Sequence, residues 1–208
     1  MRFFLVIIFT IILSSATVLT GCTPQNVTFP SQFTVVFTTE NVKNSCLGVK
    51  INDCFVLTVA HIFDVTYERK NICTLSDKSG NLYEAEVTYA DFSADLALVH
   101  MTDSDYDKKT PLVFGKSDTN FFCDSTGEMK ISKNTETVNC LSENKPDRLL
   151  RLNFTASKGE SGSAVVSPDG KITGIICAAD KFDEICYAVP SEIIVGFLSR
   201  CGIRVLLL

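Results

Sequence analysis

The sequence contains no run of lysine or arginine that could form a basic stripe, and its 19 basic residues are outnumbered by 24 acidic ones. This balance, a formal net charge of −5, argues against binding to nucleic acid. Glycine, with 11 residues, and proline, with 6, are too scarce for a collagen-like or proline-rich chain. The two histidines, His61 and His100, lie far apart and have no Cys-x-x-Cys pair in support, so the sequence shows no metal-binding signature.

Apolar residues are plentiful: 46% of the 208 residues are hydrophobic and 21% are charged. This composition predicts one folded domain of ordinary size, or two small subdomains that share a cleft. Nine cysteines are more than a reduced cytosolic protein usually carries, so they favour an oxidising compartment.

The N-terminus favours export. Arg2 precedes an apolar run, Phe3 to Leu13, and a small polar stretch follows it. This is the pattern of a signal peptide over residues 1–21, and the run spans only about 16 Å as a helix, against roughly 30 Å of bilayer core. Leu-Thr-Gly-Cys at residues 19–22 resembles a bacterial lipoprotein box, so we expect Cys22 to be acylated and residues 22–31 to form a tether. A plain cleaved signal and an uncleaved anchor are the alternatives.

Most of the remaining chain alternates apolar and polar residues with the period of a β-strand and is rich in Val, Ile, Thr and Phe. The runs predicted as strands are 32–39, 46–51, 54–59, 82–89, 96–101, 128–131, 135–141, 149–154, 163–166, 172–178 and 184–189. Only residues 192–200 favour a helix, with Ser191 as a candidate N-cap. The sequence therefore predicts an all-β protein in two halves, residues 32–115 and 116–208, with a short C-terminal helix.

Three motifs carry candidate chemistry. His61 ends the run Thr-Val-Ala-His, Asp95 precedes an apolar strand, and Ser161 lies in Gly-Glu-Ser-Gly-Ser. Glycines beside Ser161 allow a tight turn that gathers backbone N–H groups, as an oxyanion hole requires. Each motif is weak alone, because a single histidine or aspartate more often has a structural role.

In the order His61, Asp95, Ser161, these motifs resemble the chymotrypsin-like serine peptidases, and most closely their HtrA-type bacterial branch. The segments that carry the resemblance are 56–61, 91–98, 113–117, 159–163, 170–176 and 187–191. It implies two antiparallel six-stranded β-barrels with the active site between them. No PDZ domain is expected after the peptidase, since only residues 201–208 follow the predicted helix.

The resemblance also implies roles. His61 would act as general base and then general acid for Ser161, Asp95 would hold the imidazole, and the N–H groups of Gly159 and Ser161 would bind the oxyanion. No metal or organic cofactor is needed. The expected activity is hydrolysis of protein or peptide bonds outside the cytoplasm.

Substrate preference is implied by four further residues of the family's specificity pocket: Thr155, Ala178, Ala179 and Ile185. None is charged, so the resemblance predicts small or medium apolar side chains at the cleavage site rather than Arg or Lys.

The sequence departs from the family pattern in three places. Glu160 stands where Asp or Asn is usual, Ser163 where Gly is usual, and Ile62 where many secreted members have a cysteine. Glu160 and Ser163 could displace the oxyanion donors, so the alternative is a pseudoprotease that serves as an envelope-anchored binding module.

Cysteine spacing predicts two disulfides. Cys177 and Cys186 flank a short hairpin, and Cys123 and Cys140 flank neighbouring predicted strands. The remaining cysteines apart from Cys22 allow three further pairings, which the sequence does not rank: Cys46, Cys54, Cys73 and Cys201. Free cysteines buried as small apolar groups are the alternative for each.

Overall fold

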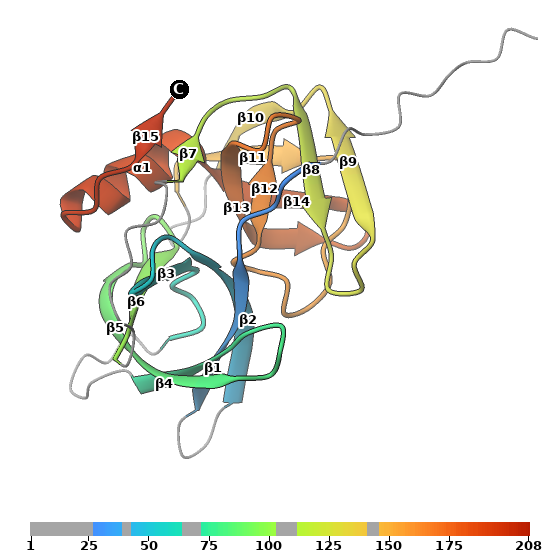
Figure 1. Ribbon diagram of the computed structural model, residues 1–208. Coiled ribbons are helices and arrows are strands. Elements are labelled where there is room, and N and C mark those ends of the chain that lie inside the picture. Colours follow the sequence, from blue (N-terminus) through green and yellow to red (C-terminus); the bar gives the residue numbers. More distant parts are fainter. Residues whose placement is uncertain (1–26, 39–42, 64–71, 103–111, 141–145) are drawn as a thin grey trace, which may run out of the picture.

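The computed structural model describes residues 27–38, 43–63, 72–102, 112–140 and 146–208. It places two β-structures next to each other, with one helix beside the second (Figure 1). The first half contains β1 (Gln32–Thr38), β2 (Lys43–Lys50), β3 (Phe55–Thr58), β4 (Ile72–Ser76), β5 (Leu82–Asp91) and β6 (Leu96–Met101). These six strands close into an antiparallel barrel in the order β1-β2-β3-β6-β5-β4, as expected.

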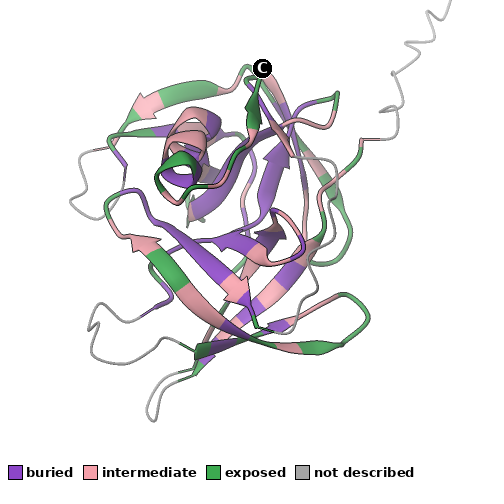
Figure 2. Cartoon of the chain, turned by 60° about the vertical axis from the view of Figure 1, so that its left-hand side comes forward, coloured by how far each residue is buried: buried purple, intermediate pink, exposed green. Residues whose placement is uncertain are grey.

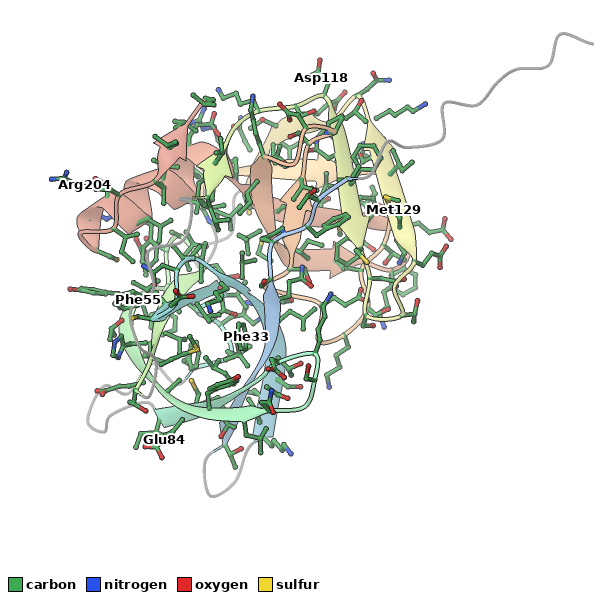
Figure 3. All side chains as sticks on the ribbon, viewed as in Figure 1. Phe33, Phe55, Glu84, Asp118, Met129 and Arg204 are labelled. Carbon is green, nitrogen blue, oxygen red and sulfur yellow. The ribbon has the colours of Figure 1, made fainter. Side chains whose placement is uncertain are left out.

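In β1 of this first barrel, buried residues alternate with more exposed ones. Along β1, Phe33, Val35 and Phe37 are buried and the residues between them are more exposed, so one face fills the barrel interior. Figure 3 shows the same contrast, with Phe33 inside the barrel and Glu84 of β5 on its outer side. The sequence analysis missed β4, because only two of its five residues are buried.

The second half contains β7 (Val113–Phe114), β8 (Thr119–Cys123), β9 (Met129–Lys133), β10 (Glu136–Asn139), β11 (Arg148–Leu152), β12 (Ala164–Val166), β13 (Ile172–Asp180), β14 (Ile185–Pro190), helix α1 (Ser191–Arg200) and β15 (Leu206–Leu207). The strands form one nine-stranded sheet whose main path runs β10-β11-β14-β13-β12-β8-β9. Off this path, β7 pairs with β13 and β15 pairs with β7, both in parallel.

This second sheet differs from the closed six-stranded barrel that we expected, because β9 and β10 end its main path instead of pairing with each other. Side chains bridge part of the gap. The Ser132 hydroxyl of β9 accepts a hydrogen bond from the backbone N–H of Asn153, just after β11, at 3.0 Å. The fold class is nevertheless confirmed: the protein is mostly antiparallel β with a short C-terminal helix.

The two halves share one hydrophobic core. The main cluster of buried side chains includes Val35 and Leu98 of the first barrel together with Ile175, Ile194 and Phe197 of the second half. Buried segments accordingly run through both halves (Figure 2). A packed interface of this kind holds the two halves in a fixed relation, as a site built between them requires.

Helix α1 closes the second half. Its N-cap is Pro190 and not Ser191, whose hydroxyl instead donates to the carbonyl of Gly115 at 2.8 Å. Ser191, which we expected to cap the helix, instead links the helix to the segment that joins the two halves. In the part of the chain that the structure describes, no helix has the length and apolar character needed to cross a bilayer.

Candidate active site

His61 and Asp95 are in direct contact. His61 lies three residues beyond β3, and its Nδ1 is 2.9 Å from Oδ2 and 3.0 Å from Oδ1 of Asp95. The backbone N–H of His61 also donates to Oδ1 at 2.9 Å. The Asp95 side chain is 2% exposed and that of His61 is 43% exposed. A buried carboxylate thus holds Nδ1–H and leaves Nε2 facing the open side, where it can accept a proton.

Asp95 lies in a tight turn between β5 and β6, with φ at +52°. The Asp91 carboxylate holds this turn, because its Oδ1 accepts the Ser93 hydroxyl at 2.6 Å and the Ala94 N–H at 3.0 Å. The left-handed conformation is unfavourable for most residues but tolerated by aspartate, and here it points the carboxylate at His61.

Ser161 lies in a loop with two glycines in left-handed conformation, Gly159 at φ +95° and Gly162 at φ +88°. The loop is tied to both halves: the Ser161 carbonyl accepts the N–H of Leu47 in β2 at 2.8 Å, and Gly162 N–H donates to Ile176 at 2.7 Å. A Cβ at Gly162 would lie 1.8 Å from the Leu47 carbonyl oxygen, so only glycine allows this approach.

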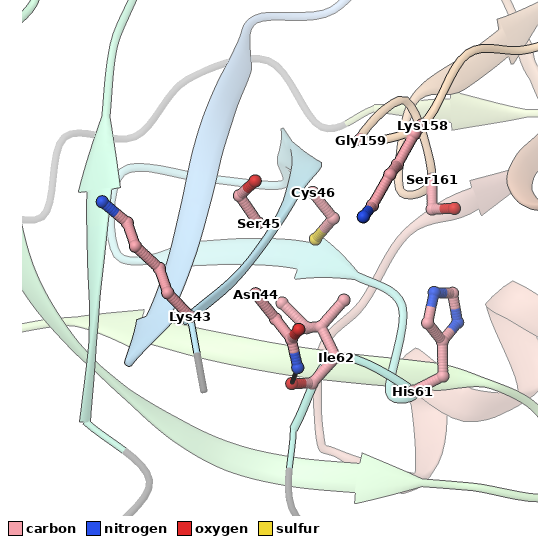
Figure 4. Close-up of a pocket in the computed structure, with 9 residues that line it drawn as sticks. All are labelled: Lys43, Asn44, Ser45, Cys46, His61, Ile62, Lys158, Gly159 and Ser161. Atoms are coloured by element: carbon pink, nitrogen blue, oxygen red, sulfur yellow. Dashed lines mark hydrogen bonds between the residues drawn. The ribbon is translucent and has the colours of Figure 1, made fainter. Parts of the chain in front are cut away.

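His61 and Ser161 line the same cavity, of about 490 Å³, and the His61 ring points towards Ser161 (Figure 4). The other lining residues are Lys43, Asn44, Ser45, Cys46, Ile62, Lys158 and Gly159. Among the sequence-predicted residues, the cavity therefore brings together His61, Ser161 and Gly159, with Asp95 behind the histidine.

The backbone N–H groups of Gly159 and Ser161 make no hydrogen bond within the described part of the chain. Nothing within 4 Å would meet a Cβ at Gly159, so space is open beside the first of these donors. Two neighbouring free N–H groups next to a serine hydroxyl can stabilise an oxyanion.

The Glu160 side chain is buried and turned away from these donors. Its Oε1 accepts the backbone N–H and the hydroxyl of Ser125, each at 2.9 Å, and its Oε2 accepts the Ser157 N–H at 2.6 Å. Glu160 therefore fastens the serine loop to the β8–β9 turn. Sequence analysis missed Ser125 because it lies 35 residues away in a turn without a motif.

Ser163 is fully buried, and its hydroxyl has no hydrogen-bond partner in the described residues. Its backbone bonds to Glu160 and Ile176 continue the turn into β12. Ser161 is therefore the accessible hydroxyl of this motif.

The predicted specificity residues lie in the second half and not in this cavity. Thr155 is in the serine loop, Ala178 and Ala179 are near the end of β13, and Ile185 begins β14 beside Asp180. One neighbour was not predicted: the Lys130 ammonium of β9 donates to the Thr155 carbonyl at 3.0 Å and lies 3.5 Å from an Asp124 carboxylate oxygen.

No disulfide joins the eight cysteines of the described residues, so the structure differs from the two disulfides that we expected. Cys177 packs in the core shared by both halves, whereas Cys186 belongs to a separate cluster within the second half. Cys123 ends β8 and Cys140 follows β10, and these strands are not neighbours in the sheet.

Cys46 lines the cavity floor, but as a thiol it is a poor nucleophile. Burial raises the pKa of Cys46 to about 12, and its Sγ lies 3.0 Å from the Thr58 hydroxyl. Burial likewise raises the pKa of Cys73 to about 12. Both thiols are therefore protonated at neutral pH, and neither competes with Ser161 as a nucleophile.

A hydrogen bond links β2 to the segment after His61, where the resemblance would place a disulfide. The Asn44 side-chain amide donates to the Ile62 carbonyl at 3.1 Å (Figure 4). This contact holds His61 and the cavity wall together although Ile62 is not a cysteine.

Within the described segments, no group of three or more His, Cys, Asp or Glu side chains could hold a metal ion.

The sequence profile of the family described as "Trypsin-like peptidase domain" matches residues 45–175. No curated protein matches the chain significantly.

Solved structures of proteases share the fold, among them the following three. The active form of the Rv3671c protease from M. tuberculosis is 18% identical, with a TM-score of 0.65 over 86% of this chain and 84% of that one. The HtrA-type protease AlgW with a tripeptide is 18% identical, with a TM-score of 0.64 over 82% of this chain and 59% of that one. A serine endoprotease from Yersinia pestis is 17% identical, with a TM-score of 0.59 over 82% of this chain and 62% of that one.

Proposed function

The chain belongs to the family of trypsin-like peptidase domains, and we propose that it hydrolyses protein or peptide bonds through His61, Asp95 and Ser161. The observation that carries this proposal is the two-oxygen contact between Asp95 and the His61 ring, on the wall of the cavity that also holds Ser161. An accessible serine, an imidazole oriented by a buried carboxylate and free backbone donors are the parts that acyl transfer needs.

In the proposed reaction, the Ser161 Oγ forms a bond to the peptide carbonyl carbon while its proton passes to His61 Nε2. The oxyanion that results is held by the N–H groups of Gly159 and Ser161. Collapse breaks the carbon–nitrogen bond, and His61 returns the proton to the leaving amine. Water then attacks the acyl-enzyme with His61 again as base, which releases the acid and restores Ser161.

The position of Glu160 favours an active enzyme over a binding-only protein. The pseudoprotease alternative requires that Glu160 or Ser163 displaces the oxyanion donors. Glu160 instead binds Ser125 and Ser157, and Ser163 is buried behind the loop. Both departures from the family pattern are therefore compatible with a working oxyanion hole.

For the acyl side of the substrate, we propose a small or medium apolar residue held near Thr155, Ala178, Ala179 and Ile185. The Lys130 ammonium beside the Thr155 carbonyl supports this preference. A substrate Arg or Lys at this position would be repelled by the Lys130 ammonium.

We also propose that the protein works outside the cytoplasm, with residues 1–21 removed and Cys22 acylated; these residues lie outside the described part of the structure. Fractionation of expressing cells provides the test. Wild type should remain with the membranes, and Cys22→Ser should be released in soluble form. Retention of Cys22→Ser on membranes would favour an uncleaved anchor.

A fluorophosphonate probe tests the catalytic proposal, because Ser161 Oγ would displace fluoride from its phosphorus only when activated. The full chain, purified in detergent, should be labelled at Ser161. Ser161→Ala and His61→Ala should lose labelling, and Asp95→Asn should slow it by about 10³- to 10⁴-fold. His100→Gln is the matched control, since His100 lies on β6 against Phe55 and away from the cavity, and it should label as wild type does.

Absence of labelling in folded wild type would overturn the peptidase proposal. It would favour the binding module, and pull-down experiments with the intact protein would then be the way to find a partner.

A further inference from the structure

Two lysines line the active-site cavity: Lys43 at the start of β2 and Lys158 beside Gly159. Among the described residues that line it, none is Asp or Glu, and Asp95 lies behind His61. Both lysines are exposed, and neither forms an ion pair with a described residue. This cationic pair is notable in a chain whose formal net charge is −5.

Two other polar side chains line the cavity, Asn44 and Ser45. The Asn44 amide donates to the Ile62 carbonyl, so it belongs to the wall (Figure 4). The Ser45 side chain is exposed and makes no hydrogen bond within the described residues. Two lysines without a described ion pair and one hydroxyl without a described hydrogen bond therefore line the cavity, and the Lys158 ammonium lies on the side of Ser161 (Figure 4). Positive charge of this kind suits a carboxylate.

The cavity lies on the leaving-group side of Ser161. Its walls come from β2 and from the segment after His61, both in the first barrel, and from Lys158. The residues expected to hold the acyl side are all in the second half, and none of them lines the cavity. Because His61 must reach the leaving amine, the chain that follows the scissile bond enters the cavity beside His61 and Ile62.

We propose that this cavity selects substrates with an acidic side chain, Asp or Glu, within the first two residues after the scissile bond. Lys158 attracts the carboxylate on the side of Ser161, and Lys43 adds positive charge to the same cavity. The inference rests on the proposed peptidase function and names a substrate feature for that site.

Paired internally quenched peptides test this selection. They are identical except at the first or second position after the cleaved bond, which carries Glu, Gln or Lys. For wild type, kcat/KM for the Glu peptide should exceed that for the Gln peptide by about fivefold to tenfold at low salt, and the Lys peptide should be poorest. The Glu preference should weaken as the NaCl concentration rises, because salt screens exposed charges.

Variants assign the preference to the two lysines. In Lys43→Gln/Lys158→Gln the Glu-to-Gln ratio should fall to about one, and in Lys43→Glu/Lys158→Glu the Lys peptide should become the better substrate. Lys78→Gln is the matched control, because Lys78 is an exposed lysine in the turn between β4 and β5, and its ratio should equal that of wild type.

The outcomes separate the two proposals. If wild type is labelled by the fluorophosphonate but its Glu-to-Gln ratio is near one, or if the double Gln variant keeps the wild-type ratio, the inference is overturned and the peptidase function stands. If wild type is not labelled, the peptidase function itself fails.

Discussion

Glu160 is one of the residues that depart from the family pattern, and its contacts define a positioning role. Its carboxylate accepts three hydrogen bonds, two from Ser125 and one from the Ser157 N–H. Because Ser157 and Glu160 lie in the loop that carries Ser161, these bonds determine where the proposed oxyanion donors, the N–H groups of Gly159 and Ser161, lie. Aspartate is shorter by one methylene, so the longer glutamate is what reaches Ser125 in this loop.

Glu160→Gln tests this role. The glutamine oxygen can still accept from Ser125, but its NH₂ group would face the Ser157 N–H, which leaves a buried donor unpaired at a cost of about 1–3 kcal/mol. We expect a lower urea midpoint and a kcat reduced by about tenfold to a hundredfold, with KM little changed, since a displaced loop impairs the transition state. Circular dichroism and steady-state kinetics provide the measurements.

Ser125→Ala is the partial control, because it removes the hydroxyl bond and keeps the backbone N–H bond, so its effects should be smaller. Wild-type kcat and stability in Glu160→Gln would show that the carboxylate does not position the loop.

At the scale of elements, the turn that joins β5 to β6 positions Asp95. Asp91 ends β5, holds Ser93 and Ala94 within the turn, and accepts a hydrogen bond from Arg200 of α1 at 2.7 Å. Burial would raise the pKa of Asp91, but the Ser93 and Ala94 hydrogen bonds and the Arg200 charge hold that pKa below its usual value. One carboxylate thus connects the turn that carries Asp95 to the C-terminal helix.

Asp91→Asn should therefore lower stability in a pH-dependent way. A folded-state pKa below the unfolded value of about 3.9 means that the stabilisation is fully present above about pH 4 and is lost as pH falls through the folded-state pKa. We expect a loss of about 1 kcal/mol at pH 7 and a difference between variant and wild type that narrows towards pH 3. Urea unfolding at both pH values measures this difference.

Arg200→Gln distinguishes the contribution of the Asp91–Arg200 ion pair from that of the hydrogen bonds within the turn. This variant removes the contact with α1 and leaves the bonds from Ser93 and Ala94 to Asp91 in place. A difference between Asp91→Asn and wild type that stays constant from pH 7 to pH 3 would contradict the assignment to the ionised carboxylate.

At the scale of the whole molecule, the two halves are joined by a shared core and by the loop that carries the serine. The main cluster contains residues of both halves, and the Leu47–Ser161 hydrogen bond crosses between them at 2.8 Å. Neither half can expose its part of this core without exposing the other's. The molecule should therefore unfold as one cooperative unit.

Two probes of urea unfolding test this cooperativity. The sequence has no tryptophan, and four of its five tyrosines lie before residue 112, so tyrosine fluorescence reports mainly on the first half. Far-UV circular dichroism reports on both halves. The two curves should coincide in wild type, and Gly162→Ala, whose new Cβ would meet the Leu47 carbonyl, should shift both to lower urea together. Separate transitions would mean that each half unfolds alone.

Much of the fold was predictable because most strands show the alternation of apolar and polar residues within their own segment. The alternation that forms β1, β3 and β13 lies within each segment, and the strands were predicted near their observed bounds. β7 and β15 were missed because they have two residues each, and β4 because only two of its five residues are buried; β8 was also missed. Closure of the second sheet was also misjudged, since it depends on pairing between β9 and β10, which no local pattern reports.

The sequence by itself determined the all-β class, the order of His61, Asp95 and Ser161, and the glycines that allow the serine turn, because each is a property of a few adjacent residues. Only the tertiary structure decided which distant groups meet: Asp95 with His61, Glu160 with Ser125, and Asn44 with Ile62. It also decided that Lys43 and Lys158 line one cavity. Such contacts depend on strand register and on how loops pack between two halves, and these are settled by the burial of the whole core.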